Sequence, residues 1–287
     1  MFIDDLEEGL RSEVLKFADD TKIFGRVDSG GPSEELQRDL DRLVQWSEVW
    51  QMRFNVDKCK VMHLGKRNAG GSYVMNGGTL GEVSEERDLG VRITSDLKAT
   101  AQCNYVCSKA NRVLGMIRRT MVYRSPDILT RLYKSLVRPH LEYCVSAWSP
   151  HYVKDRERLE RVQHRFTRMV PGLKGLEYGG RLERLNLMTL EERRNRADLV
   201  ELFKISKGLS AIPWNSFRVD SSDRTRGHSK KLVKGSFRRD IRKYFFSLRV
   251  VNRWNGLSEE VVSAGTVGTF KKRLEELRMT KKGLLKD

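Results

Sequence analysis

The chain has 287 residues, of which 39% are hydrophobic and 32% are charged, and its formal net charge is +17. This length is sufficient for one large or two modest domains with a buried core, and the composition excludes a wholly disordered chain. No apolar run approaches the length of a membrane span, and the first residues have neither the basic nor the apolar region of a secretory signal. The scattered cysteines favour free thiols in a reducing compartment. We therefore expect an intracellular, non-secreted protein of the nucleus or cytoplasm, with no membrane contact.

The charge is distributed unevenly along the chain. Residues 1–100 contain 14 basic and 19 acidic side chains, a net charge of −5, whereas the remainder contains 41 basic and 19 acidic side chains, a net charge of +22. This asymmetry predicts a polyanionic partner, and nucleic acid fits better than an anionic membrane surface. The alternative is a merely basic surface. Nucleic acid is favoured because the basic residues recur on several expected helices rather than in one tail.

The first expected element is a β-hairpin around Phe17-Ala18-Asp19-Asp20, with strands over 14–17 and 21–24. Two neighbouring carboxylates repel each other unless a cation lies beside them. Mg²⁺ takes oxygen ligands, so the pair is a plausible half of a two-metal phosphoryl-transfer site. Asp-Asp is also an ordinary turn dipeptide, and these residues alone leave both interpretations open.

An amphipathic helix should follow, with Ser33 as its N-cap and with Leu36, Leu40, Leu43, Ser47 and Trp50 on one face. Two short strands are then expected around an Asp57-Lys58 turn, the second ending at Gly65. A small β segment over 72–93 should contain strands at 73–75 and 89–93 and a turn at 76–78.

From about residue 99 the periodicity is helical. We expect helices over 101–121 and 155–170, the second with its arginines outside and a stop at Pro171-Gly172. Ser125-Pro126 should start another helix, which Pro139 interrupts and which resumes over 141–148. Thr189 and Glu192 form a capping-box pattern, and Gly208 is a plausible C-terminal cap of the same helix. The expected outer arginines of 155–170 are Arg156, Arg158, Arg161, Arg165 and Arg168.

The last part of the chain should begin with a loop or linker over 213–236. An apolar cluster within 245–254 is then expected to dock onto the rest, and a final helix should span 269–279. The fold class is α+β passing into mostly α. We divide the chain into segments 1–66, 67–124, 125–212 and 213–287.

Other residue patterns favour structural roles. His140, Cys144 and His151 have spacings that a metal trio could use, but structural Zn²⁺ sites take four ligands and no fourth is evident. Cys103 and Cys107 should share a packed helix face. The tryptophans that coincide with apolar faces are expected in the core rather than as base-stacking platforms. These tryptophans are Trp46, Trp50, Trp148 and Trp254.

At this point several motifs, in order, resemble one family. Phe17-Ala18-Asp19-Asp20 resembles the (Tyr/Phe)-Ala-Asp-Asp box of reverse transcriptases from non-LTR (LINE) retrotransposons. Asn55-Val56-Asp57-Lys58-Cys59-Lys60 resembles the next palm motif, and His63-Leu64-Gly65-Lys66 resembles the primer-grip strand. Glu86-Arg87-Asp88-Leu89-Gly90-Val91 resembles the strand that leads into the thumb. Residues 132–144, 148–150 and 245–255 resemble the C-terminal region of vertebrate CR1-type members.

The resemblance implies a partial reverse-transcriptase palm, a β-hairpin with a helix, followed by a helical thumb and C-terminal region. It implies an RNA-directed DNA polymerase in which Asp19, and less directly Asp20, hold Mg²⁺ for two-metal nucleotidyl transfer. Lys58 would lie near the leaving pyrophosphate, and His63, Leu64 and Gly65 would place the primer end. Lys58 as a solvated turn lysine and His63 as a plain strand residue remain alternatives. The RNA template and DNA primer would be held through their backbones by Lys109, Arg112, Arg118, Arg119, Arg158, Arg161 and Arg165.

The family also uses an aspartate from an earlier palm strand, together with fingers that bind the incoming nucleotide. Neither has a counterpart in this sequence, so we expect a 5′-truncated fragment whose two-metal site is incomplete and which does not polymerise alone. The alternatives are a non-catalytic nucleic-acid-binding protein derived from a retroelement, and a scaffold or open reading frame with no selected role.

Overall fold

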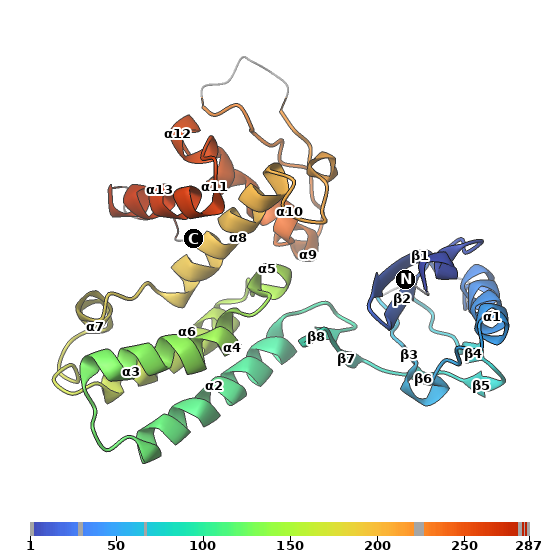
Figure 1. Cartoon of the computed structure of the whole chain (residues 1–287), viewed down its shortest axis with the longest axis horizontal. Helices are drawn as coiled ribbons and strands as arrows, with labels where there is room; N and C mark the ends of the chain where they lie inside the picture. The colour runs from blue at the N-terminus through green and yellow to red at the C-terminus, as the bar shows by residue number, and fades with distance from the viewer. Residues whose placement is uncertain are drawn as a thin grey trace. The chain divides into compact units, whose positions relative to one another are not determined.

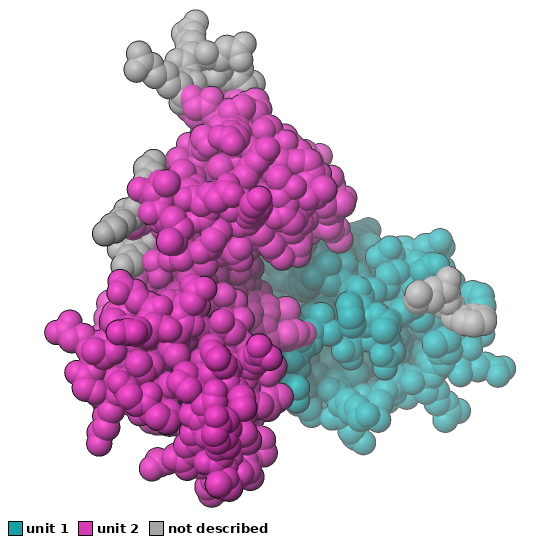
Figure 2. Space-filling model, turned by 60° about the vertical axis from the view of Figure 1, so that its left-hand side comes forward, with its two compact units in different colours: residues 1–97 teal, residues 98–287 magenta. Residues whose placement is uncertain are grey.

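The computed structural model describes residues 3–27, 31–65, 68–220 and 227–280, together with residues 283 and 285. In these ranges helices and strands are mixed, which confirms the α+β class at that coarse level (Figure 1). The chain divides into two compact units, residues 1–97 and 98–287 (Figure 2). The boundary falls inside the expected segment 67–124, so the β segment and the helix that follows it belong to different units.

Unit 1 is built from short paired strands and one long helix. Its sheets have two strands each: β1–β2, β4–β5 and β7–β8 are antiparallel, and β3–β6 is parallel. The elements are a 3₁₀ turn (Asp4–Glu7), β1 (Glu13–Phe17), β2 (Asp20–Phe24), α1 (Glu34–Val49), a second 3₁₀ turn (Val56–Lys58), β3 (Lys60–Val61), β4 (Val74–Met75), β5 (Gly78–Thr79), β6 (Gly81–Glu82), β7 (Glu85–Asp88) and β8 (Val91–Thr94).

Helix α1 supplies much of the core of unit 1. Ser33 caps it as expected, because its side chain accepts a hydrogen bond from the Leu36 N–H. Ser47 is buried on the expected face, whereas Trp50, just past the helix end, is 48% exposed. The core comprises Leu6, Leu40, Leu43, Tyr73, Met75 and Leu80.

Two polar side chains of α1 join the helix to the strands. The buried Asp39 carboxylate accepts hydrogen bonds from the backbone N–H groups of Arg11 and Ser12, just before β1. Burial alone would raise the pKa of Asp39, but these hydrogen bonds outweigh it and hold the pKa below its usual value. The Gln37 amide exchanges two hydrogen bonds with the backbone of Val74, as a neighbouring strand would.

Several strand predictions in unit 1 were wrong. No strand precedes the Asp57-Lys58 turn, because the Asn55 side chain caps a 3₁₀ turn there. The expected primer-grip strand stops at Val61, so His63, Leu64 and Gly65 lie after it in an irregular segment. Lys66 lies outside the described residues.

The expected strand over 89–93 was wrong at its start. Leu89 and Gly90 have φ values of 43° and 87°, so they form the turn of the β7–β8 hairpin. Two successive positive φ values are typical of a two-residue hairpin turn, because the backbone twist of that turn matches the twist of the flanking strands. Asn76 and Gly77, with φ values of 48° and 74°, form the equivalent turn between β4 and β5, where a turn was expected.

Unit 2 is helical in its described residues. Its elements are α2 (Thr100–Thr120), α3 (Pro126–Leu132), a π-helical segment (Tyr133–Val137), α4 (Arg138–Glu142), α5 (Val145–Trp148), α6 (Val153–Met169), α7 (Tyr178–Arg184), α8 (Leu190–Ser206), a 3₁₀ turn (Trp214–Ser216), α9 (Asp240–Lys243), α10 (Phe246–Arg249), α11 (Val251–Asn255), α12 (Glu259–Val262) and α13 (Val267–Thr280). The helices expected over 101–121, 155–170 and 269–279 are confirmed as α2, α6 and α13.

The expected helix break at Pro139 was wrong. Proline lacks an N–H and its ring clashes with the carbonyl four residues earlier in a regular α-helix. Here the preceding turns are π-helical, with the Arg138 N–H bonded to the Tyr133 carbonyl, and the helix continues to Glu142. The break comes at Cys144, whose φ is 49°. The wider π turns accommodate the proline ring.

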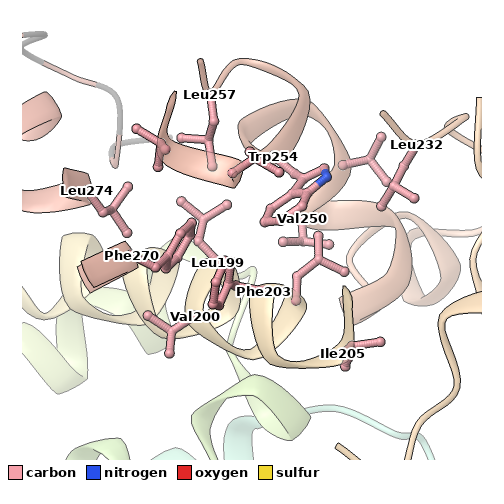
Figure 3. Close-up of a cluster of buried hydrophobic side chains, with 14 of the residues drawn as sticks. Leu199, Val200, Phe203, Ile205, Leu232, Val250, Trp254, Leu257, Phe270 and Leu274 are labelled. Atoms are coloured by element: carbon pink, nitrogen blue, oxygen red, sulfur yellow. The ribbon is translucent and has the colours of Figure 1, made fainter. Parts of the chain in front are cut away.

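The C-terminal part of unit 2 packs around Trp254, which is fully buried (Figure 3). Side chains of α8, including Leu199 and Phe203, lie against it together with Phe270 of α13. Residues 213–236 were expected as a loop or linker. The described residues there are largely irregular, but Phe217 and Leu232 belong to this core, so the segment is not a linker. The apolar cluster of residues 245–254 docks as expected.

No helix among the described residues is both long and apolar enough to cross a membrane.

Candidate functional site

The β1–β2 hairpin carries the two candidate metal ligands of unit 1. Phe17 pairs with Asp20 across the ladder, so Ala18 and Asp19 form the two-residue turn and Asp20 is the first residue of β2. Ala18 has a φ of 53°, a left-handed conformation that L-residues adopt at a cost. The hairpin prediction is therefore confirmed, with Asp20 one position beyond the turn.

Both carboxylates of this hairpin are exposed. The side chains of Asp19 and Asp20 have no hydrogen bond or ion pair with another described residue. Lys22 lies on the same strand face as Asp20, but its ammonium group is paired with Asp88 of β7 at 2.5 Å. The oxygens of both aspartates are thus available to a cation.

The other expected residues of unit 1 do not join this pair through hydrogen bonds or ion pairs. Lys58 is exposed at the end of its 3₁₀ turn, as a solvated turn lysine would be. The His63 ring stacks on Tyr73, and its Nε2 atom lies 3.6 Å from a Glu82 carboxylate oxygen. Leu64 is 46% exposed.

Gly65 has a φ of 95° and is followed by residues outside the described part of the chain. Within that part, no three His, Cys, Asp or Glu side chains gather so that they could hold a metal ion. The aspartate pair therefore supplies two carboxylates and would need further ligands to form a two-metal site.

A line of cations follows the exposed face of α6 in unit 2. Arg158, Arg161 and Arg165 are exposed and recur at the three- and four-residue spacing that places side chains on one helix face. Lys154 and Arg168 extend the same spacing at the two ends, over about 21 Å at 1.5 Å per residue. We call these five residues, Lys154, Arg158, Arg161, Arg165 and Arg168, the α6 stripe.

Most cations of the α6 stripe have no carboxylate partner among the described residues. Arg161 pairs with Glu157 one turn away, at 3.2 Å, and both side chains are exposed. Arg165 donates a hydrogen bond to the Asn111 side chain of α2, which packs beside α6. Arg158 has no ion pair with another described residue. An exposed pair such as Arg161–Glu157 contributes little energy, so an incoming phosphate can replace it.

The four expected residues of α2 are spread around that helix. Arg112 and Arg119 point away from its buried face, and Arg118 is exposed on another side. Lys109 is half-buried, with its ammonium group 5.2 Å from the centre of the Tyr105 ring. The three arginines are thus open to a nucleic-acid backbone, whereas Lys109 is less accessible.

Sequence reasoning misassigned one arginine of α6 and missed one lysine. Arg156 was expected outside, but it is half-buried and pairs with Glu191 of α8 at 2.9 Å. Lys154 belongs to the α6 stripe, and its position four residues before Arg158 was the signal that could have identified it.

The cysteines of α2 are unsuited to metal binding or nucleophilic chemistry. Cys103 and Cys107 share the packed face, as expected. Burial raises the pKa of Cys107 to about 11 and raises that of Cys103 further. Both thiols therefore stay protonated near neutral pH.

Comparisons of the chain with protein-family models, with curated proteins and with solved structures found no match.

Proposed function

We propose that the chain is a nucleic-acid-binding part of a non-LTR (LINE, CR1-type) retrotransposon reverse transcriptase, an RNA-directed DNA polymerase. The ordered motifs support this proposal, as does a hairpin that presents two unpaired carboxylates beside its turn. In the intact enzyme Asp19 and Asp20 would hold Mg²⁺, which supplies electrostatic stabilisation of the phosphoryl group being transferred. Lys58 and the His63–Gly65 segment would serve the pyrophosphate and the primer end.

Nucleic-acid binding is the part of this proposal that the geometry supports best, and the α6 stripe carries it. Its exposed cations follow one helix face in a unit with a large positive net charge. Such a line fits the regularly spaced phosphates of an RNA–DNA duplex and needs no base contact. The alternative function, a non-catalytic nucleic-acid-binding protein, rests on the same stripe and differs only in whether the aspartates are used.

The binding proposal is tested by the salt dependence of affinity for a primer–template duplex. Replacing Arg158, Arg161 and Arg165 by Gln should weaken binding at low salt. It should also reduce the slope of log K against log salt by about 2–3, because each lost phosphate contact removes up to ~0.9. The measurement is fluorescence anisotropy over a series of salt concentrations.

The matched control is a triple Gln variant of exposed basic residues elsewhere in unit 2, namely Arg218, Lys271 and Lys272. It has the same net charge and should keep most of the wild-type slope. Equal slopes for the two triple variants would contradict the stripe and would leave only a diffuse effect of net charge.

Polymerase activity is tested by primer extension with Mg²⁺ and all four nucleotides. We expect no extension by this chain alone, because no third His, Cys, Asp or Glu side chain among the described residues gathers with Asp19 and Asp20 into a metal site. Extension that disappears in the Asp19→Asn variant would overturn the expectation of inactivity and would identify the chain as a polymerase in its own right.

A further inference from the structure

A row of aromatic rings and cations begins at the N-terminal end of the α6 stripe. The Lys154 ammonium group lies 5.7 Å from the centre of the Tyr152 ring. Tyr152 contacts His151 at a ring-centre distance of 4.0 Å. His151 stacks on Tyr244, with ring centres 4.4 Å apart and planes 6° from parallel. The row therefore crosses from the start of α6 to the residue after α9, which is far away in the sequence.

The row continues along the C-terminal segment of unit 2. Lys243 lies 5.0 Å from the centre of the Tyr244 ring and 5.9 Å from that of Phe237. Beside it, the Arg242 guanidinium lies 5.6 Å from the centre of the Phe245 ring. Aromatic rings and cations thus follow one another along one connected surface. We call Lys154, Tyr152, His151, Tyr244, Lys243 and Phe237 the aromatic row.

Arg249 holds the C-terminal end of this surface in place. Its guanidinium donates to both carboxylate oxygens of Asp198 on α8, at 2.8 and 2.9 Å, and to the Ser146 carbonyl of α5, at 2.6 Å. It also donates to the backbone carbonyl of Tyr244, the residue whose ring stacks on His151, at 3.1 Å. The surface is therefore organised before any ligand arrives, which lowers the entropy cost of binding.

Two rings at this surface, Phe237 and Phe245, keep much of their area in contact with solvent. Phe237 is 42% exposed and Phe245 is 54% exposed, although large apolar side chains gain free energy from burial. Asp240 is the one carboxylate of α9, and four cations surround it in the sequence. These cations are Arg238, Arg239, Arg242 and Lys243. Exposed rings among uncompensated cations match a strand whose bases are unpaired and whose phosphates are accessible.

We propose that the aromatic row, with the adjoining Phe245, binds single-stranded nucleic acid. Bases stack on Phe237 and Phe245, while Lys243, Arg242 and Lys154 contact the phosphates. Because Lys154 also belongs to the α6 stripe, a strand leaving a duplex held on the stripe would run directly onto the row. This inference deepens the proposed function and rests on it for the duplex, but single-strand binding is measured separately.

The test uses the whole chain and a fluorescent homopolymer of about 20 nucleotides, DNA or RNA, longer than the ~4–16 nucleotides of a typical single-strand site. Replacing Phe237 and Phe245 by Ala should weaken single-strand binding about 25-fold or more, since each of the two lost stacked bases costs at least about fivefold. Affinity for a blunt duplex should change less than about twofold, because its bases are not free to stack.

Two further variants separate stacking from structure. Tyr123→Ala removes a ring of unit 2 that is 72% exposed and has no cation or ring contact with another described residue, so it should leave single-strand binding unchanged. Phe245→Trp should retain binding, and its added indole emission should fall when a base stacks on it. The thermal unfolding midpoint of the double alanine variant should stay close to wild type, because both rings are exposed.

The outcomes separate this inference from the proposed function. If the Arg158, Arg161 and Arg165 variant loses duplex binding and the double alanine variant keeps it, the α6 stripe is supported. If the double alanine variant binds the single strand as tightly as wild type, the aromatic row is overturned. If the double alanine variant loses single-strand binding while the triple arginine variant keeps its duplex binding, the aromatic row is supported and the α6 stripe is overturned. Binding to phosphatidylserine vesicles but not to either homopolymer would assign the exposed rings to a membrane surface and would also overturn the row.

Discussion

At the scale of single residues, His228 links folding to pH. The Lys230 N–H donates to its Nδ1 atom, so the ring proton is on Nε2, which donates to the Trp254 carbonyl at 2.9 Å. Burial, only partly offset by the Trp254 hydrogen bond, lowers the pKa of His228. Protonation would place a charge on a buried ring and would remove the acceptor that Lys230 uses.

We expect the free energy of unfolding of unit 2 to decrease as the pH falls from about 7.5 to about 5.5. A histidine whose pKa is lower in the folded than in the unfolded state stabilises the fold fully above its unfolded pKa of about 6.5. That stabilisation is lost as the pH falls toward the pKa of the folded state. His228→Gln should flatten this dependence in urea unfolding. His151 and His164, whose pKa values are also lowered by burial, should preserve a smaller slope of the same sign. An identical slope in the variant would assign the effect elsewhere.

At the scale of elements, the start of α8 is the clearest local signal. Thr189 Oγ1 accepts from the Glu192 N–H at 3.1 Å, and the Glu192 carboxylate accepts from the Thr189 N–H at 3.0 Å. This reciprocal pair satisfies two N–H groups at the end of a helix that carries the Trp254 core.

Thr189→Ala should destabilise unit 2 by about 1 kcal/mol, since it removes one half of the capping box. Thr189→Ser keeps the hydroxyl and is the matched control, expected within about 0.5 kcal/mol of wild type. Urea unfolding followed by circular dichroism measures both. Equal losses in the two variants would point to the threonine methyl group rather than the cap.

The sequence predicted helices better than strands because helix signals are local. Ser33, Ser125-Pro126 and Thr189 mark helix starts that the structure has at those positions. The β7–β8 hairpin was missed because Leu89, an apolar residue, adopts the left-handed conformation of a turn. An apolar residue in the sequence does not indicate that conformation. The continuation through Pro139 depends on a π-helical segment, a backbone adjustment that no residue type specifies.

The candidate sites also differ in whether their residues could be predicted from local sequence patterns. The aspartate hairpin and the arginines of the α6 stripe follow from contiguous residues or helical spacing, so they could be predicted. The aromatic row joins residues 151–154 to residues 237–244, and only the folded unit brings them together. The half-burial of Arg156 likewise depends on Glu191, a residue of a different helix.

At the scale of the whole molecule, the two units have separate cores, and their net charges are opposite in sign. Leu43 is buried in the core of unit 1 and Phe203 in that of unit 2. A chain with two such cores need not unfold in a single transition.

We expect urea unfolding in two steps, with Leu43→Ala lowering the midpoint of one and Phe203→Ala that of the other. Each substitution should cost about 2–5 kcal/mol in its own unit. Circular dichroism reports mainly on helical unit 2, and hydrogen exchange of α1 amides reports on unit 1. A single transition that both variants shift equally would show that the units unfold together.

The conformation of Ala18 has a consequence for protein engineering. A glycine at this position would adopt a φ of 53° without the Cβ clash that costs an L-residue about 1–2 kcal/mol. The chain therefore accepts a local loss of stability at the turn that carries its two candidate ligands. A search for stabilised versions would select glycine at this position, and the added backbone freedom would loosen the aspartates. Stability and function would then favour different residues at position 18.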